Sequence, residues 1–209
     1  MFTRGNVLRD QDLWANKKMR VIAGKYRSRP LRSLPGMDIR PTSDRLRETL
    51  FNVLCGGNPE ALAGTAWLDL YAGTGAVGIE ALSRGAGFVH FVECSAKAVA
   101  LIEKNLQSLG ISAAFKIIRA EAETAIRKLD GLNAVFDFVF VDPPYRMEAA
   151  YQETLELLGQ ARLIKNSTLI IAEHDRKFDP GEEFGRLRRS RKLEQGDSGL
   201  SFYGVAEPR

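Results

Sequence analysis

Residues 66–80, Ala-Trp-Leu-Asp-Leu-Tyr-Ala-Gly-Thr-Gly-Ala-Val-Gly-Ile-Glu, decide the fold class. They predict a short apolar strand, a glycine turn and the start of a helix. Gly73, Gly75 and Gly78 fit the G-x-G-x-x-G spacing, and Glu93 lies 20 residues beyond Gly73, where it can accept from ribose hydroxyls. Because glycines let the backbone approach a ligand closely, we expect a cofactor loop. The alternative is a tight strand–helix turn without a ligand.

Strand and helix patterns alternate on both sides of this loop. The predicted strands span residues 66–72, 87–93, 114–119, 135–141 and 167–173, and the predicted helices span 77–84, 96–109, 121–129 and 147–158. This alternation indicates an α/β protein with a doubly wound parallel sheet. In the order 3-2-1-4-5, the first and fourth strands are neighbours and flank the ligand crevice. The tail, Leu187–Leu193 and Leu200–Ala206, predicts a closing hairpin.

The segment Asp142-Pro143-Pro144-Tyr145 ends the apolar run that begins at Phe136. Two prolines stop the strand, because neither can donate to a sheet ladder. The Asp142 carboxylate and the Pro143 carbonyl can accept the two hydrogen bonds of an exocyclic amine on a flat base. Tyr145 offers a face for stacking. The alternative is an ordinary strand-to-loop turn, in which Asp-Pro is common.

An acid at Asp69 argues against a nicotinamide cofactor. It would oppose a pyrophosphate but suit a ligand with an ammonium or sulfonium group. Because the strands ending near Asp69 and Asp142 are predicted neighbours, the glycine loop and the Asp-Pro-Pro-Tyr turn should face each other, as methyl transfer to an amine requires. At the same rim, Glu121 could accept from an adenine amine and the Ala122 N–H could serve a ring nitrogen. For Glu121 the alternative is an ordinary acid in a first helical turn.

Composition limits the function classes. With 209 residues, 44% of them hydrophobic, the chain suits one α/β domain with a small appendage. No uncharged apolar run approaches the ~18 residues of a membrane span, and the N-terminus does not resemble a signal peptide. Cys55, Cys94, His90 and His174 lack metal-ligand spacing, so no metal is predicted. The two isolated thiols are expected to be reduced, as in the cytoplasm.

Positive charge is concentrated near the N-terminus. Residues 1–50 hold 12 Lys and Arg against 5 Asp and Glu, a net of +7, whereas residues 51–209 hold 18 against 21, a net of −3. We therefore expect the N-terminal segment to bind nucleic acid. A second cluster comprises Arg186, Arg188, Arg189, Arg191 and Lys192, for which a solvated charged surface is an equal alternative.

The chain is predicted to have three parts. Residues 1–18 are a flexible extension, residues 19–57 form a basic hairpin and helix, and residues 58–209 form the main domain, after the Gly-Gly-Asn-Pro boundary. The hairpin is expected over 20–31, and Thr42 or Ser43 is expected to cap the helix. Leu46, Leu50, Phe51, Val53 and Leu54 make its apolar face, while Arg45, Arg47 and Glu48 are expected to point elsewhere. The candidate RNA contacts are Arg20, Lys25, Arg27, Arg29, Arg40, Arg45, Arg47 and Pro144.

Four stretches carry a resemblance to a known family. They are Arg20–Arg27, Arg40–Asn52, Asp69–Ala86 and Phe140–Tyr145. On these stretches the chain resembles the RsmD family of S-adenosylmethionine-dependent 16S ribosomal RNA guanine-N2 methyltransferases. The resemblance implies a class I, Rossmann-like methyltransferase fold with an antiparallel last strand. It also implies S-adenosylmethionine as cofactor and one guanine of the small ribosomal subunit, or its precursor, as acceptor.

These arguments together assign the site residues. The predicted catalytic residues are Asp142, Pro143 and Tyr145, and the predicted cofactor contacts are Asp69, Tyr71, Ala72, Gly73, Thr74, Gly75, Glu93, Cys94, Glu121, Ala122 and Asp142. The expected reaction is direct in-line methyl transfer to guanine N2, by a cytoplasmic protein without membrane or metal. The alternatives are an adenine-N6 methyltransferase, a non-catalytic RNA-binding or ribosome-assembly protein, and an NAD-linked reductase.

Overall fold

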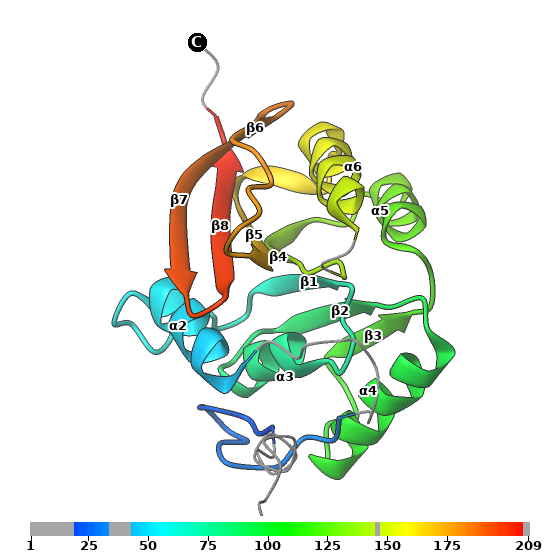
Figure 1. The fold of residues 1–209 in the computed structure, drawn as a ribbon. Helices are drawn as coiled ribbons and strands as arrows, with labels where there is room; N and C mark the ends of the chain where they lie inside the picture. The colour runs from blue at the N-terminus through cyan, green and yellow to red at the C-terminus, as the bar shows by residue number, and fades with distance from the viewer. Residues whose placement is uncertain (1–18, 34–42, 145–146, 207–209) are drawn as a thin grey trace, which may run out of the picture.

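The computed structural model describes residues 19–33, 43–144 and 147–206. In this part of the chain an eight-stranded sheet has the order β3-β2-β1-β4-β5-β8-β7-β6 (Figure 1). The strands are β1 Ala66–Leu70, β2 Phe88–Val92, β3 Phe115–Ile118, β4 Phe136–Val141, β5 Ile164–Asp175, β6 Glu183–Phe184, β7 Leu187–Gln195 and β8 Ser198–Val205. The first five strands follow the predicted order, and the predicted closing hairpin is β7 and β8.

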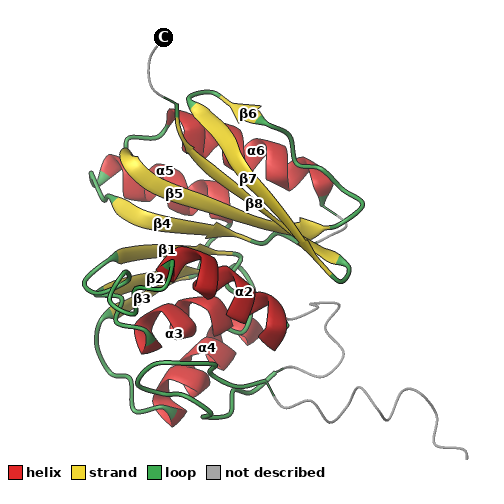
Figure 2. Cartoon of the chain, turned by 90° about the vertical axis from the view of Figure 1, so that its left-hand side faces the viewer, coloured by secondary structure: helices red, strands yellow, loops and turns green. Residues whose placement is uncertain are grey.

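Helices cover both faces of the sheet (Figure 2). They are α2 Asp44–Cys55, α3 Ala76–Ser83, α4 Ala96–Ser108, α5 Ala122–Gly131 and α6 Glu148–Gln160. One apolar cluster joins α2, α3 and α4 to one face, and a second cluster joins α5 and α6 to the other. The doubly wound arrangement predicted from the alternating pattern is therefore confirmed.

The strand register brings the two predicted loops to one edge. β1 pairs in parallel with β2 on one side and with β4 on the other, so that Leu70 lies opposite both Val92 and Val141. β4 in turn pairs in parallel with β5, whereas β8 runs antiparallel to β5. Because parallel strands share a direction, the glycine loop after β1 and the turn after β4 leave the same edge of the sheet.

The predicted N-terminal hairpin is a loop closed by a single bridge, between Arg20 and Pro30. No β-ladder extends from that bridge, because several backbone N–H groups of the loop are used elsewhere. The N–H groups of Ile22 and Ala23 donate to the two carboxylate oxygens of Glu80 on α3, at 2.7 and 3.0 Å. The loop is thus fastened to α3 in place of forming two strands.

Helix α2 begins where the sequence predicts, with Ser43 as its N-cap and the Ser43 hydroxyl accepting from the Leu46 N–H. The expectation that Arg47 points away from the core is wrong, because its side chain is fully buried. Arg47 donates to the carbonyl of Arg20 at 2.8 Å and pairs with Asp44 at 2.6 Å. Residues on both sides of the predicted boundary at position 57 pack in one apolar core. The division of the chain into parts at this position stays a prediction.

Candidate methyl-transfer site

The loop of residues 71–75 between β1 and α3 has an unusual backbone. Gly73 and Gly75 have φ values of 53° and 76°, and Tyr71 also lies in the left-handed region, at 59°. A non-glycine residue there costs about 1 kcal/mol or more, and such strain is concentrated at functional sites. The Tyr71 hydroxyl is hydrogen-bonded to the Thr154 hydroxyl of α6 at 2.8 Å, which helps to hold this conformation.

Glu93 braces the glycine loop from the end of β2. Its carboxylate accepts from the Gly73 N–H at 2.9 Å and from the Ser95 N–H at 2.8 Å. A carboxylate has about four acceptor positions, so hydrogen bonds from a ligand remain geometrically open to it. The predicted contact between Glu93 and ribose hydroxyls is compatible with this geometry and stays a prediction.

Carboxylates gather where β1, β4 and β5 end. Asp69 is buried and accepts from the Gly78 N–H at 3.0 Å. Burial, only partly offset by this hydrogen bond, raises the pKa of Asp69 to about 8. Burial, followed by the negative charges of Glu173 and Asp69, also raises the pKa of Asp142 well above its ordinary value. A cationic ligand would relieve this repulsion, whereas an anionic one would increase it.

Two residues missed by the sequence analysis support the site. Tyr151 of α6 is buried, and its hydroxyl donates to the Glu173 carbonyl at 2.8 Å and lies 3.4 Å from the Pro143 carbonyl. Asn105 of α4 is also buried and donates to the Thr74 carbonyl at 3.0 Å. Polar residues on the apolar faces of amphipathic helices were the available signal, because such groups need buried partners.

The predicted adenine end of the site lies at the start of α5. Glu121 is the N-cap residue of α5, and its side chain makes no capping hydrogen bond. The thiol of Cys94 is exposed. Partial burial, then the charge of Glu93 and then the charge of the nearby Glu121 raise the pKa of this thiol. Cys94 and Glu121 therefore lie close together, with Ala122 next in the chain. Ala72 and Thr74 lie in the glycine loop. Their contacts with a cofactor stay predictions.

The candidate RNA contacts differ in exposure. Arg20, Lys25, Arg27, Arg29, Arg45 and Pro144 are exposed, whereas Arg40 and Tyr145 lie outside the described residues. Arg47 is withdrawn from this set, because its guanidinium is buried among protein acceptors. The C-terminal basic cluster is largely neutralised: Arg188 pairs with Glu183, and both Arg189 and Lys192 pair with Asp179.

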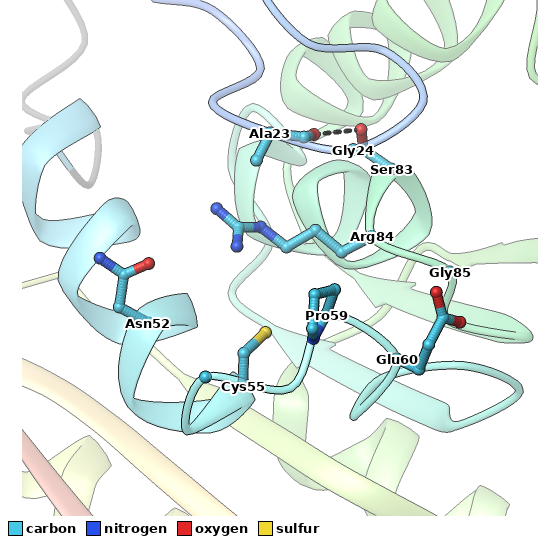
Figure 3. Close-up of a pocket in the computed structure, with 10 residues that line it drawn as sticks. Ala23, Gly24, Asn52, Cys55, Pro59, Glu60, Ser83, Arg84 and Gly85 are labelled. Atoms are coloured by element: carbon cyan, nitrogen blue, oxygen red, sulfur yellow. Dashed lines mark hydrogen bonds between the residues drawn. The ribbon is translucent and has the colours of Figure 1, made fainter.

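Figure 3 shows a hollow of about 730 Å³ that none of Asp69, Asp142 and Glu173 lines. Its lining includes Ala23 of the N-terminal loop, Asn52 and Cys55 of α2, and Ser83 and Arg84 at the end of α3. The glycine loop lies at the opposite end of α3, about 12 Å away for a helix of this length. We therefore do not assign this hollow to the cofactor.

Over the described residues, none of the helices combines the length and the apolar character needed to cross a membrane. In the same ranges, no group of three or more His, Cys, Asp or Glu side chains is arranged to hold a metal ion.

The raised pKa of Asp69 predicts that the cofactor-free protein loses stability as pH rises. Asp69 titrates near its ordinary pKa of 3.8 when unfolded and near 8 when folded, so the folded state binds the extra proton between these values. The free energy of unfolding should therefore fall through this window, by up to about 1.4 kcal/mol per pH unit for one proton. Urea unfolding between pH 5 and 8 would measure the slope, which Asp69→Asn should flatten.

Asp137→Asn is the matched control for this titration. Burial acts to raise the pKa of Asp137, but hydrogen bonds from Lys165 and from the Ala66 N–H outweigh it and lower the pKa. Its proton is therefore released below pH 5, so the variant should shift stability without changing the slope. Equal slopes for Asp69→Asn and the wild type would contradict the assignment.

Comparison with known proteins agrees with this geometry. Residues 19–204 match the family described as "Conserved hypothetical protein 95". "Putative rRNA methyltransferase YlbH" of Bacillus subtilis is 35% identical over 185 residues, which cover 88% of this chain and 98% of that protein. "Ribosomal RNA small subunit methyltransferase D" of Haemophilus influenzae is 35% identical, covering 78% and 81%. The solved structure of "Putative methyltransferase yhhF from Escherichia coli" has a TM-score of 0.76 at 27% identity, covering 91% and 99%.

Proposed function

The chain belongs to the RsmD family, whose family model matches residues 19–204. From this premise we propose that it methylates the N2 amine of a guanine in small-subunit ribosomal RNA, with S-adenosylmethionine as donor. The observation that carries the proposal is the shared edge of β1 and β4, where the glycine loop and the Asp142 turn meet. The target within an assembled subunit or its precursor, and a cytoplasmic location, are part of the same proposal.

The residues at this edge fit S-adenosylmethionine. Bound there, the cofactor would supply an electrophilic methyl group on a sulfonium. Asp69, which is buried, and Asp142, which is half-buried, form an acidic surface that favours a ligand with ammonium and sulfonium charges. Glu93 has acceptor positions left for ribose hydroxyls, and Glu121 with the adjacent Ala122 N–H would contact the adenine.

Asp142 and Pro143 would orient the acceptor amine. The lone pair of guanine N2 is conjugated into the ring, so the amine is a weak nucleophile. Two acceptors, the Asp142 carboxylate and the Pro143 carbonyl, would hold its N–H bonds and direct the lone pair to the methyl group. As positive charge develops on N2, the Asp142 carboxylate would stabilise it. Tyr145 would stack on the base, which must leave any helical stack to enter the site.

The exposed basic residues of the N-terminal loop would hold the RNA backbone. Arg20, Lys25, Arg27 and Arg29 project from one segment that is fastened to α3 and α4. Arg20 lies near the glycine loop, because its carbonyl accepts from Arg47, which also donates to Ala76 at the start of α3. Phosphates bound along this segment would bring the RNA toward the catalytic edge, with an affinity that falls as salt rises.

Methyl transfer from labelled S-adenosylmethionine tests the proposal. The acceptors are small-subunit particles from cells that lack their own enzyme of this family, the naked ribosomal RNA and duplex DNA. We expect label in the ribosomal RNA and none in DNA, because the target base edge must be accessible in a loop. Label confined to DNA, to adenine, or absent from all three acceptors would refute the proposal.

A further inference from the structure

Glu173 is the acidic neighbour of Asp142 on the next strand. β4 and β5 pair in parallel with Val141 opposite Ala172, so Asp142 and Glu173 follow at equivalent positions. Phe140 and Ile171, two residues earlier on each strand, pack in the same apolar cluster. Because side chains alternate along strands, Asp142 and Glu173 project from the same face. Glu173 is only 2% exposed, so its carboxylate is held within the protein beside the catalytic turn.

Tyr151 links the backbone of Glu173 to the turn that follows Asp142. Its buried hydroxyl donates to the Glu173 carbonyl at 2.8 Å and lies 3.4 Å from the Pro143 carbonyl. The end of β5 is therefore fixed relative to the Asp-Pro turn by a side chain of α6. A guanine whose amine is held by Asp142 and Pro143, with its N1 edge toward β5, would present the N1–H to Glu173.

We infer that Glu173 selects guanine by accepting a hydrogen bond from the guanine N1–H, next to the amine held by Asp142. This inference rests on the proposed function. Of the two ring nitrogens beside the guanine amine, N1 carries a hydrogen and is a donor, whereas in adenine the ring nitrogen beside the N6 amine is an acceptor. A carboxylate accepts from the first and repels the second. A site built to accept from a substrate N–H rejects an analogue that lacks it.

The test compares guanine with 2-aminopurine at the methylated position. 2-Aminopurine keeps the amine on C2 but has no hydrogen on N1. Both RNAs are prepared by ligation, once the nucleotide that the wild type methylates has been mapped. The value of kcat/KM is then measured for each RNA with the wild type, with Glu173→Gln and with the control Glu103→Gln, whose position is exposed. Glutamine has nearly the same shape but can donate from its amide to the bare N1.

We expect the wild type and Glu103→Gln to have a much higher kcat/KM with the guanine RNA than with the 2-aminopurine RNA. Glu173→Gln should lower the ratio of these two kcat/KM values by about 10-fold or more, because a charge-assisted hydrogen bond is lost. Affinity for S-adenosylhomocysteine, measured by calorimetry, should stay within about 3-fold. If Glu173→Gln lacks a cooperative unfolding transition, Glu173→Asp, which keeps the charge but shortens the reach, is measured in its place and should narrow the preference.

The outcomes separate this inference from the proposed function. If the Glu173 variant keeps the wild-type preference for guanine over 2-aminopurine, the inference alone is overturned. If that variant also loses affinity for S-adenosylhomocysteine, Glu173 is assigned to the cofactor instead. A wild-type protein that methylates no guanine overturns both.

Discussion

Asp142→Ala is expected to lower kcat for methyl transfer by about 10²- to 10³-fold, while affinity for S-adenosylhomocysteine changes only a few-fold. The loss follows because the carboxylate both orients the amine and stabilises charge that develops only in the transition state. The cofactor retains Asp69, Glu93 and the glycine loop, which the substitution does not touch. Single-turnover assays with saturating RNA, together with calorimetry, would measure the two effects separately.

Asp137→Ala is the matched control on the same strand. Asp137 lies near the opposite end of β4 and contacts Lys165 and the Ala66 N–H, far from the glycine loop. It should alter stability without altering kcat. Near-wild-type turnover in Asp142→Ala, or equal losses in both variants, would contradict the role of Asp142.

Gly78→Ala is expected to destabilise the protein by about 1–3 kcal/mol and to weaken cofactor binding. A methyl group at this position would lie 2.3 Å from Phe91 Cε1 and 2.8 Å from Val89 Cγ1, both in buried side chains of β2. Helix α3 would have to move away from the sheet, which is the cost of overpacking a core. The movement would also shift the Gly78 N–H from Asp69 and displace the glycine loop.

Gly131→Ala makes the same chemical change where space is open. Gly131 is the last residue of α5, and an added methyl group would meet nothing within 4 Å. This variant should be neutral or more stable by up to about 1 kcal/mol, because alanine favours the helix. Urea unfolding of both variants measures the difference; a Gly78→Ala protein as stable as Gly131→Ala would show that α3 does not pack as described.

The sheet order and the position of the site could be predicted because their signals are local. Glycines at fixed spacing after an apolar strand, and the proline turn after Val141, each define an element within about fifteen residues. The strand at Ile164–Asp175 was predicted to begin too late, at position 167, since Lys165 and Asn166 are exposed and polar and the ladder with β4 is irregular there. β6, with two residues, is too short to leave a pattern.

The missed features depend on contacts that are distant in sequence. Arg47 shares a helix face with Leu50 and Phe51, three and four residues later, yet its charge argues for an exposed position. Only the fold reveals the backbone carbonyls of Arg20 and Ala76 that accept from it. Likewise, the role inferred for Glu173 depends on the pairing of β4 with β5.

The identity of the methylated nucleoside tests the central claim most directly. Small-subunit particles are incubated with the protein and deuterium-labelled S-adenosylmethionine, and the RNA is digested to nucleosides for mass spectrometry. The arrangement of the glycine loop opposite the Asp142 turn, within this family, predicts that N2-methylguanosine is the labelled nucleoside. Labelled N6-methyladenosine, a methyl group on ribose, or no labelled nucleoside would contradict it.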